Sequence, residues 1–157
     1  MITDFYGRCA DILKRKKLWL LDMDGTIYNE NEIFDGTLDF LQQIKDHGGR
    51  YIFITNNSSK SVNDYVEKVT RMGIQAGLED FYTSSQATAM YIRENYPGQT
   101  VYCMGTRSLV TELRESGLTV VTEPDENASI VLIGFDTENT SEKIRNTCIM
   151  LGRDVVY

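Results

Sequence analysis

Histidine, proline, cysteine and long apolar runs are all scarce in this chain of 157 residues, which has one histidine, two prolines and three cysteines. These counts disfavour a histidine-based metal centre and a disulfide framework, since the cysteines are odd in number and widely spaced. We expect Cys9, Cys103 and Cys148 to be reduced and mostly buried, as in a cytoplasmic protein. No stretch approaches the roughly 20 apolar residues of a membrane-spanning helix, and the N-terminus lacks the pattern of a signal peptide.

Positive charge is also in short supply. The chain carries 16 lysines and arginines against 23 acidic residues, a net charge of −7. Nucleic acids and anionic membranes both require a basic surface, so neither is expected as a partner. The basic cluster Lys14–Lys17 fits a solvated helix end. The single histidine, His47, lies in a polar turn, and we assign it no catalytic role.

Short apolar segments recur at regular intervals along the chain. Short apolar runs alternate with helical patterns, which is typical of βα units around a parallel sheet. Strands are predicted over residues 18–21, 51–54, 80–83, 100–104, 118–121 and 129–133, with a further strand beginning at residue 155. A helix is predicted after each of the strands except the one at 118–121, the last over residues 141–151, and residues 27–34 read as a short polar excursion.

Two aspartates separated by one residue follow the first apolar run. Leu18–Leu21 reads as a strand, and Asp22 and Asp24 come directly after it. Alternate residues of a strand point to the same side, so both carboxylates should converge at the carboxyl end, where open α/β sheets bind ligands. Their repulsion would be relieved by Mg²⁺, which prefers oxygen ligands, and Gly25 would let the chain turn away. The pair therefore predicts a magnesium site.

A carboxylate at such an edge also supports phosphoryl transfer. Asp22 is the better nucleophile candidate because it closes the rigid strand, and its attack on phosphorus would give an aspartyl-phosphate. Asp24 would protonate the leaving oxygen and later accept a proton from the attacking water. A divalent cation would offset the repulsion between the nucleophile and the anionic phosphoryl group.

A second polar turn, Thr55–Ser59, follows the next strand. Alone it is weak evidence, because a polar turn with a serine at the start of a helix is common. Consecutive strands of a parallel sheet are usually neighbours, however, so this turn should face the same crevice as Asp22 and Asp24. Its backbone N–H groups and hydroxyls would then form an anion cradle.

These motifs resemble those of the haloacid dehalogenase-like superfamily of phosphohydrolases. Leu20–Thr26 is similar to the first motif of that family, and Ile54–Asn57 to the second. The form of the second motif, together with Tyr28 and Gly36, resembles the branch of nitrophenylphosphatase and NagD-type enzymes. Three later segments resemble the third core strand and the cap of that branch: Tyr82–Ser85, Tyr102–Thr106 and Val131–Asp136.

The resemblance implies a role for each predicted site residue. Asp22 would be the nucleophile and a Mg²⁺ ligand, and Asp24 the acid/base and a ligand through its backbone carbonyl. Thr55, with Asn56 and Asn57, would bind the transferring phosphoryl group.

The same resemblance implies an α/β fold in two parts. Residues 1–83 would form the first part of a Rossmann-like parallel-sheet core, and residues 84–157 an incomplete α/β cap. The implied function is that of a cytoplasmic, Mg²⁺-dependent phosphoric monoester hydrolase. Its substrate would be a small phosphorylated metabolite such as a sugar phosphate or nucleotide.

The departures from the family pattern matter as well. The cap loop that meets the substrate would include Asp136, while the family's phosphate-binding lysine and further acidic metal ligand would follow Tyr157. Lys143 and Asp154 read as surface residues rather than replacements for them. We therefore expect residues 18–21 to form an unpaired sheet edge. The isolated chain should self-associate, bind Mg²⁺ weakly and hydrolyse phosphate esters slowly if at all.

Other readings of the motifs differ in class. Phosphorylated ATPases resemble Asp-Lys-Thr-Gly-Thr, where threonine stands in place of Asp24, and Asp24 favours rapid hydrolysis instead. A phospho-receiver domain would need an acceptor aspartate at the end of the third strand, which Phe81–Ser84 lacks. A noncatalytic phosphate-binding or interaction remnant of the same fold is the remaining alternative.

Overall fold

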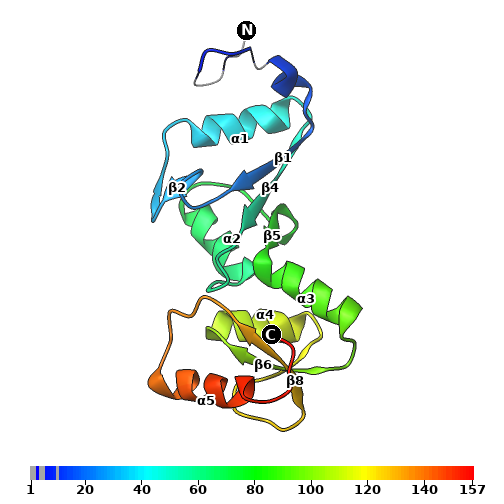
Figure 1. Cartoon of the computed structure of the whole chain (residues 1–157). Helices are drawn as coiled ribbons and strands as arrows, with labels where there is room; N and C mark the ends of the chain where they lie inside the picture. Colours follow the sequence, from blue (N-terminus) through cyan, green and yellow to red (C-terminus); the bar gives the residue numbers. More distant parts are fainter. Residues whose placement is uncertain (1–2, 4–5, 10) are drawn as a thin grey trace.

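The computed structural model describes residues 3, 6–9 and 11–157, which form two three-stranded parallel sheets and a small antiparallel hairpin (Figure 1). The first sheet has the order β1-β4-β5, and its strands are β1 (Leu18–Asp22), β4 (Arg50–Thr55) and β5 (Phe81–Thr83). The second has the order β7-β6-β8, with β6 (Thr100–Met104), β7 (Thr119–Val121) and β8 (Ala128–Ile133). The predicted α/β fold is confirmed.

Helices connect most of the strands. They are α1 (Thr37–Asp46), α2 (Val62–Arg71), α3 (Ser84–Asn95), α4 (Arg107–Glu115) and α5 (Ser141–Leu151), with short 3-10 helices η1 (Asp11–Arg15) and η2 (Leu78–Asp80). None of the helices in the described part of the chain is long and apolar enough to cross a membrane.

Two helices of the first half begin directly after strand-end turns. Ser61 and Asp64 form a capping box at the start of α2, and Thr83 and Gln86 form one at the start of α3. Each box satisfies N-terminal N–H groups that the helix itself leaves unpaired. Both helices are therefore fixed at the carboxyl edge of the first sheet.

Each sheet has its own apolar core. The first combines residues of β1, β4 and β5 with residues of α1 and α2, among them the fully buried Phe53 and Val69. In the second sheet, alternate residues of β6 face opposite sides. Val101 packs in a cluster with α3 and α4, whereas Tyr102 packs with Met150 of α5. Helices thus cover both faces of the second sheet.

The chain passes from the first sheet to the second through α3 (Figure 1). The predicted division into residues 1–83 and 84–157 stays a prediction, although the change of sheet occurs next to it.

Strand β1 lies at the edge of the first sheet and pairs, among the described residues, with β4 alone. Leu18 and Leu20 are 55% and 60% exposed, whereas Leu21 is buried. The expected unpaired apolar edge is present.

Two local predictions were incomplete. Residues 27–34 are not merely a polar excursion, because β2 (Tyr28–Asn29) and β3 (Glu32–Ile33) pair there as an antiparallel hairpin. The strand predicted from residue 155 is reduced to one isolated bridge between Ile130 and Val156.

The prediction that the cysteines are mostly buried was wrong for two of the three. Cys9 and Cys148 are exposed free thiols, and only Cys103 is buried. Burial, with the charge of Asp136 adding to it, raises the pKa of Cys103 to about 12. That thiol therefore stays protonated and packs as a small apolar side chain.

Candidate active site

The register of the first sheet brings its two polar strand ends together. Asp22, the last residue of β1, is opposite Ile54 of β4, so Asp22 and Thr55 lie at neighbouring carboxyl ends. Thr55 is in turn opposite Thr83 at the end of β5. The adjacency expected from the order of the strands along the chain is present.

The two aspartates flank a buried residue. Met23 is fully buried, while Asp22 and Asp24 are both exposed, which is the alternation expected of an extended segment. The chain then turns at Gly25, whose φ of 82° is unfavourable for side-chain-bearing residues, and the Gly25 N–H donates to the Tyr28 carbonyl at 2.8 Å. The turn leaves both carboxylates on the solvent side of the strand end.

A lysine and a tyrosine surround Asp24. Lys68 of α2 lies with its Nζ 3.7 Å from Asp24 Oδ1 and 3.7 Å from the centre of the Tyr28 ring. Tyr28 is fully buried, and its hydroxyl has no hydrogen-bond partner among the described residues. Burial, followed by the negative charges of Asp24 and Asp22, raises the Tyr28 pKa. Its phenol therefore remains neutral beside the two carboxylates.

Sequence reasoning did not identify Lys68, whose ammonium contacts both Asp24 and Tyr28. The available signal was its spacing. Lys68 follows the buried Tyr65 by three residues and precedes the buried Val69, so it borders the buried face of α2. Tyr28 was noticed through family resemblance alone.

The turn after β4 is held by its own side chains. The Asn57 N–H donates to Thr55 Oγ1 at 3.2 Å, and both the N–H and the hydroxyl of Ser59 donate to Asn57 Oδ1, at 3.0 and 2.7 Å. Tyr65 of α2 donates its hydroxyl to the Asn57 carbonyl at 3.1 Å and lies 3.5 Å from Thr55 Oγ1. Burial is the main cause that raises the pKa of Tyr65.

These internal hydrogen bonds reduce the number of N–H groups that the turn could offer to an anion, compared with the cradle predicted from the sequence. The N–H groups of Asn57 and Ser59 already donate to side chains of the turn, and that of Ser61 donates to Asp64 of α2. Asn56 is exposed, and its carbonyl accepts a hydrogen bond from the Ser84 hydroxyl at 3.2 Å. An anion would therefore meet the remaining groups of the turn rather than a set of wholly free amides.

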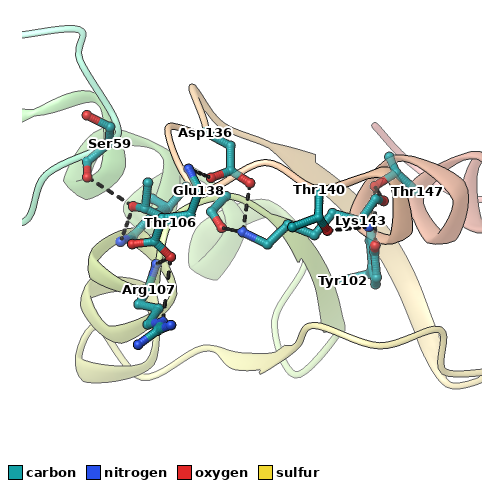
Figure 2. A network of polar contacts seen from close by, with 11 residues as sticks. Ser59, Tyr102, Thr106, Arg107, Asp136, Glu138, Thr140, Lys143 and Thr147 are labelled. Atoms are coloured by element: carbon teal, nitrogen blue, oxygen red, sulfur yellow. Dashed lines mark hydrogen bonds and ion pairs between the residues drawn. The ribbon is translucent and has the colours of Figure 1, made fainter.

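Asp136, in the loop between β8 and α5, and Lys143 of α5 form a separate polar centre (Figure 2). The Asp136 side chain is only 3% exposed and accepts from Lys143 Nζ at 2.8 Å. Lys143 Nζ also donates to the Gly105 carbonyl at 2.9 Å. Lys143 is therefore half-buried and paired, which corrects its interpretation as a plain surface residue, whereas Asp154 is exposed as expected.

The donor set of the strand end suits a hard cation. Asp22 and Asp24 supply exposed carboxylate oxygens, and Mg²⁺ is commonly held by one or two carboxylates with several retained waters. Within residues 3, 6–9 and 11–157, no group of three or more His, Cys, Asp or Glu side chains is arranged to hold a metal. The exposed oxygens of Asp22 and Asp24 fit a cation whose other ligands are water molecules. The roles assigned to Asp22, Asp24, Thr55, Asn56 and Asn57 stay predictions.

Comparison with known proteins gives consistent relatives. The chain is 39% identical over 132 residues to an acid sugar phosphatase of Staphylococcus aureus, covering 84% of this chain and 50% of that protein. It thus spans about half the length of this relative.

Solved structures agree with the sequence match. A 4-nitrophenylphosphatase from Thermotoga maritima superposes with a TM-score of 0.81 at 34% identity, covering 89% of this chain and 52% of that one. For NagD from Escherichia coli K-12 the TM-score is 0.75 at 26% identity, covering 87% and 53%. The resemblance to the nitrophenylphosphatase and NagD branch is thereby confirmed.

The family itself is shown by a model of the haloacid dehalogenase-like hydrolases that matches residues 19–119. This segment contains both polar strand ends of the first sheet and continues into β7 of the second. On this match the chain belongs to the haloacid dehalogenase-like hydrolases.

Proposed function

We propose that this protein is a Mg²⁺-dependent phosphatase that hydrolyses a small phosphorylated metabolite through an aspartyl-phosphate on Asp22. The observation that carries the proposal is the register of the first sheet, which sets Asp22 beside the Thr55 strand end. Phosphatase names among the relatives support the reaction class.

Each group at the strand end has a defined task in this reaction. An Asp22 oxygen attacks phosphorus, and the bond from phosphorus to the leaving alcohol oxygen breaks. Asp24 gives its proton to that oxygen, and it later takes a proton from the water that hydrolyses the aspartyl-phosphate. Thr55, Asn56 and Asn57 bind the phosphoryl oxygens. Mg²⁺ held by Asp22 and Asp24 would supply positive charge that offsets the repulsion between nucleophile and substrate.

A related structure supports the choice of metal. The glycerol phosphate phosphatase of Mycobacterium tuberculosis, solved in complex with magnesium, superposes with a TM-score of 0.79 at 25% identity, covering 89% of this chain and 42% of that one. Together with the oxygen donors of Asp22 and Asp24, this favours Mg²⁺.

The names of the relatives also narrow the substrate. The curated relative is an acid sugar phosphatase. We therefore infer that sugar phosphates are substrates here, and that an aryl phosphate serves as a generic probe.

The test measures phosphate release from 4-nitrophenyl phosphate and from a panel of sugar phosphates, with Mg²⁺ or with a chelator. Asp22→Asn should abolish release, and Asp24→Asn should lower it by about 10²–10⁴-fold, the usual worth of positioned proton transfer. Asp154→Asn removes an exposed aspartate far along the chain and should leave the rate unchanged.

A second measurement detects the reactive aspartate without requiring turnover, and so applies even if hydrolysis is slow. Beryllium fluoride forms an acyl-phosphate-like adduct with a reactive aspartate, and ¹⁹F NMR should detect it on the wild-type chain with Mg²⁺ but not on Asp22→Asn. Trapping the adduct on Asp22→Asn would overturn the nucleophile assignment. Binding of phosphate without turnover or adduct would instead establish the noncatalytic alternative.

A further inference from the structure

The loop between β4 and α2, residues 56–61, contacts the second sheet through two hydrogen bonds. Phe135 in the loop after β8 donates its N–H to Ser58 Oγ at 2.8 Å. Thr106, at the start of α4, donates its hydroxyl to the Ser59 carbonyl at 3.0 Å (Figure 2). Ser59 and Thr106 are both buried, so the second bond is shielded from water.

Glycine at position 134 leaves room for Leu109 of α4 on the second sheet and for Ser58 of the loop. A Cβ atom on Gly134 would lie 2.5 Å from Leu109 Cδ2 and 3.1 Å from Ser58 Oγ. A Cβ on Gly105 would lie 2.6 Å from the same Leu109 carbon. The Gly134 N–H donates to the Met104 carbonyl at 2.8 Å, which ties this turn to β6. The contact is therefore built into the backbone of the second sheet.

Further contacts fix the far end of the loop. Glu112 of α4 is 7% exposed, and its carboxylate accepts a hydrogen bond from Thr83 Oγ1 at 3.5 Å. Asp64 accepts hydrogen bonds from the N–H and the hydroxyl of Ser61, both at 2.8 Å, which fixes the end of the loop to α2. α4 thus contacts Thr83, which is opposite Thr55 at the neighbouring strand end.

The hydrogen bonds continue inward to the candidate site. Ser59, held by Thr106 through its carbonyl, donates twice to the Asn57 side chain. Asn57 in turn donates its N–H to Thr55 Oγ1. An unbroken series of bonds therefore runs from the second sheet to the end of β4.

We infer that Ser58 and Thr106 are positioning residues, through which the second sheet sets the conformation of the 56–61 loop. The consequence for phosphoryl binding by Thr55, Asn56 and Asn57 rests on the proposed function. The second sheet would then influence the phosphate site indirectly, because neither Ser58 nor Thr106 touches the phosphoryl group.

Hydrogen–deuterium exchange and phosphate titration of the whole chain test this inference. Ser58→Ala and Thr106→Val should each speed deuterium uptake in peptides covering residues 56–61. Each should weaken the affinity for inorganic phosphate in Mg²⁺ by roughly threefold to tenfold, as expected for one lost hydrogen bond.

Two further variants separate positioning from general destabilisation. Thr106 also accepts from the Leu109 N–H and caps α4, so Thr106→Ser, which keeps the hydroxyl, should restore both measurements. Ser129→Ala removes a hydroxyl of β8 that donates to the Gln99 side chain, and it should change neither.

The outcomes distinguish the two proposals. Uptake and affinity that match wild type in both Ser58→Ala and Thr106→Val would overturn the inference. Faster loop exchange in these variants, combined with no phosphate binding by the wild-type chain, would support the positioning role and overturn the proposed function.

Discussion

The ammonium group of Lys68 lies 3.7 Å from the Asp24 carboxylate, and the two residues come from different elements of the first sheet region. The same ammonium lies over the face of the buried Tyr28 ring. Lys68 therefore links α2 to Asp24 by an ion pair and to Tyr28 by a cation–π contact.

Lys68→Met should slow phosphate release and destabilise the chain. The variant loses both the ion pair and the cation–π contact, and the latter is worth about 0.5–2 kcal/mol. Urea unfolding measures the stability, and the 4-nitrophenyl phosphate assay measures the rate. Lys68→Arg keeps the charge and should retain most of both properties. Equal behaviour of the Met and Arg variants would show that the charge of Lys68 is unimportant.

Replacing the exposed leucines of β1 should reduce self-association. Leu18 and Leu20 lie on an edge strand whose backbone groups are open to pairing with another chain. The double variant Leu18→Lys, Leu20→Lys places charges on that edge, and sedimentation velocity should show a shift toward monomer. Leu78→Lys, at a leucine that is also 55% exposed, is the matched control and should not shift the distribution.

Glu112 should make the stability of the chain fall as pH rises. Burial raises the pKa of this carboxyl, and the hydrogen bond from Thr83 Oγ1 only partly opposes that effect. At a pH below the unfolded-state pKa of about 4.3, the group is protonated in both states. Above it the unfolded chain loses the proton first, so stability declines until the folded pKa is reached.

Glu112→Gln removes this proton linkage. The stability of the variant relative to wild type should therefore increase between pH 4 and pH 7, as measured by urea unfolding. Glu94→Gln, at an exposed position of α3, controls for the loss of charge and should show no such trend. A pH-independent difference for Glu112→Gln would contradict the prediction.

Gly134→Ala should destabilise the packing of α4 against the turn after β8. The new Cβ would overlap Leu109 Cδ2 at 2.5 Å, and Leu109 is too buried to move freely. Overpacking of this kind costs about 1–3 kcal/mol. Gly152→Ala, where a Cβ would meet its nearest neighbour at an ordinary 3.5 Å, should cost less in the same unfolding experiment.

Most helices and strands could be predicted because the sequence marks where they begin and end with capping residues and glycines. α5 was predicted over residues 141–151 and occupies Ser141–Leu151, since Thr140 caps its start and Gly152 follows its end. The hairpin of Tyr28–Asn29 and Glu32–Ile33 was missed because two-residue strands are too short to show an alternating pattern.

The strand-end geometry of the site was also predictable. The placement of Asp22 beside Thr55 follows from local order along the chain, because consecutive parallel strands tend to pair. The contacts of Asp24 with Lys68 and of Asp136 with Lys143 depend on how helices pack, which no local pattern records. For the same reason Cys148 was expected to be buried and is exposed.

The hydrogen bonds that hold the 56–61 loop in place have a consequence for the rate of ligand binding. On the proposed function, the loop would not have to fold when a phosphate ion binds, because the N–H groups of Asn57, Ser59 and Ser61 already have partners. A preorganised site loses little conformational entropy on binding and does not delay association. Differences in affinity among ligands of this loop should therefore arise chiefly in how fast they leave.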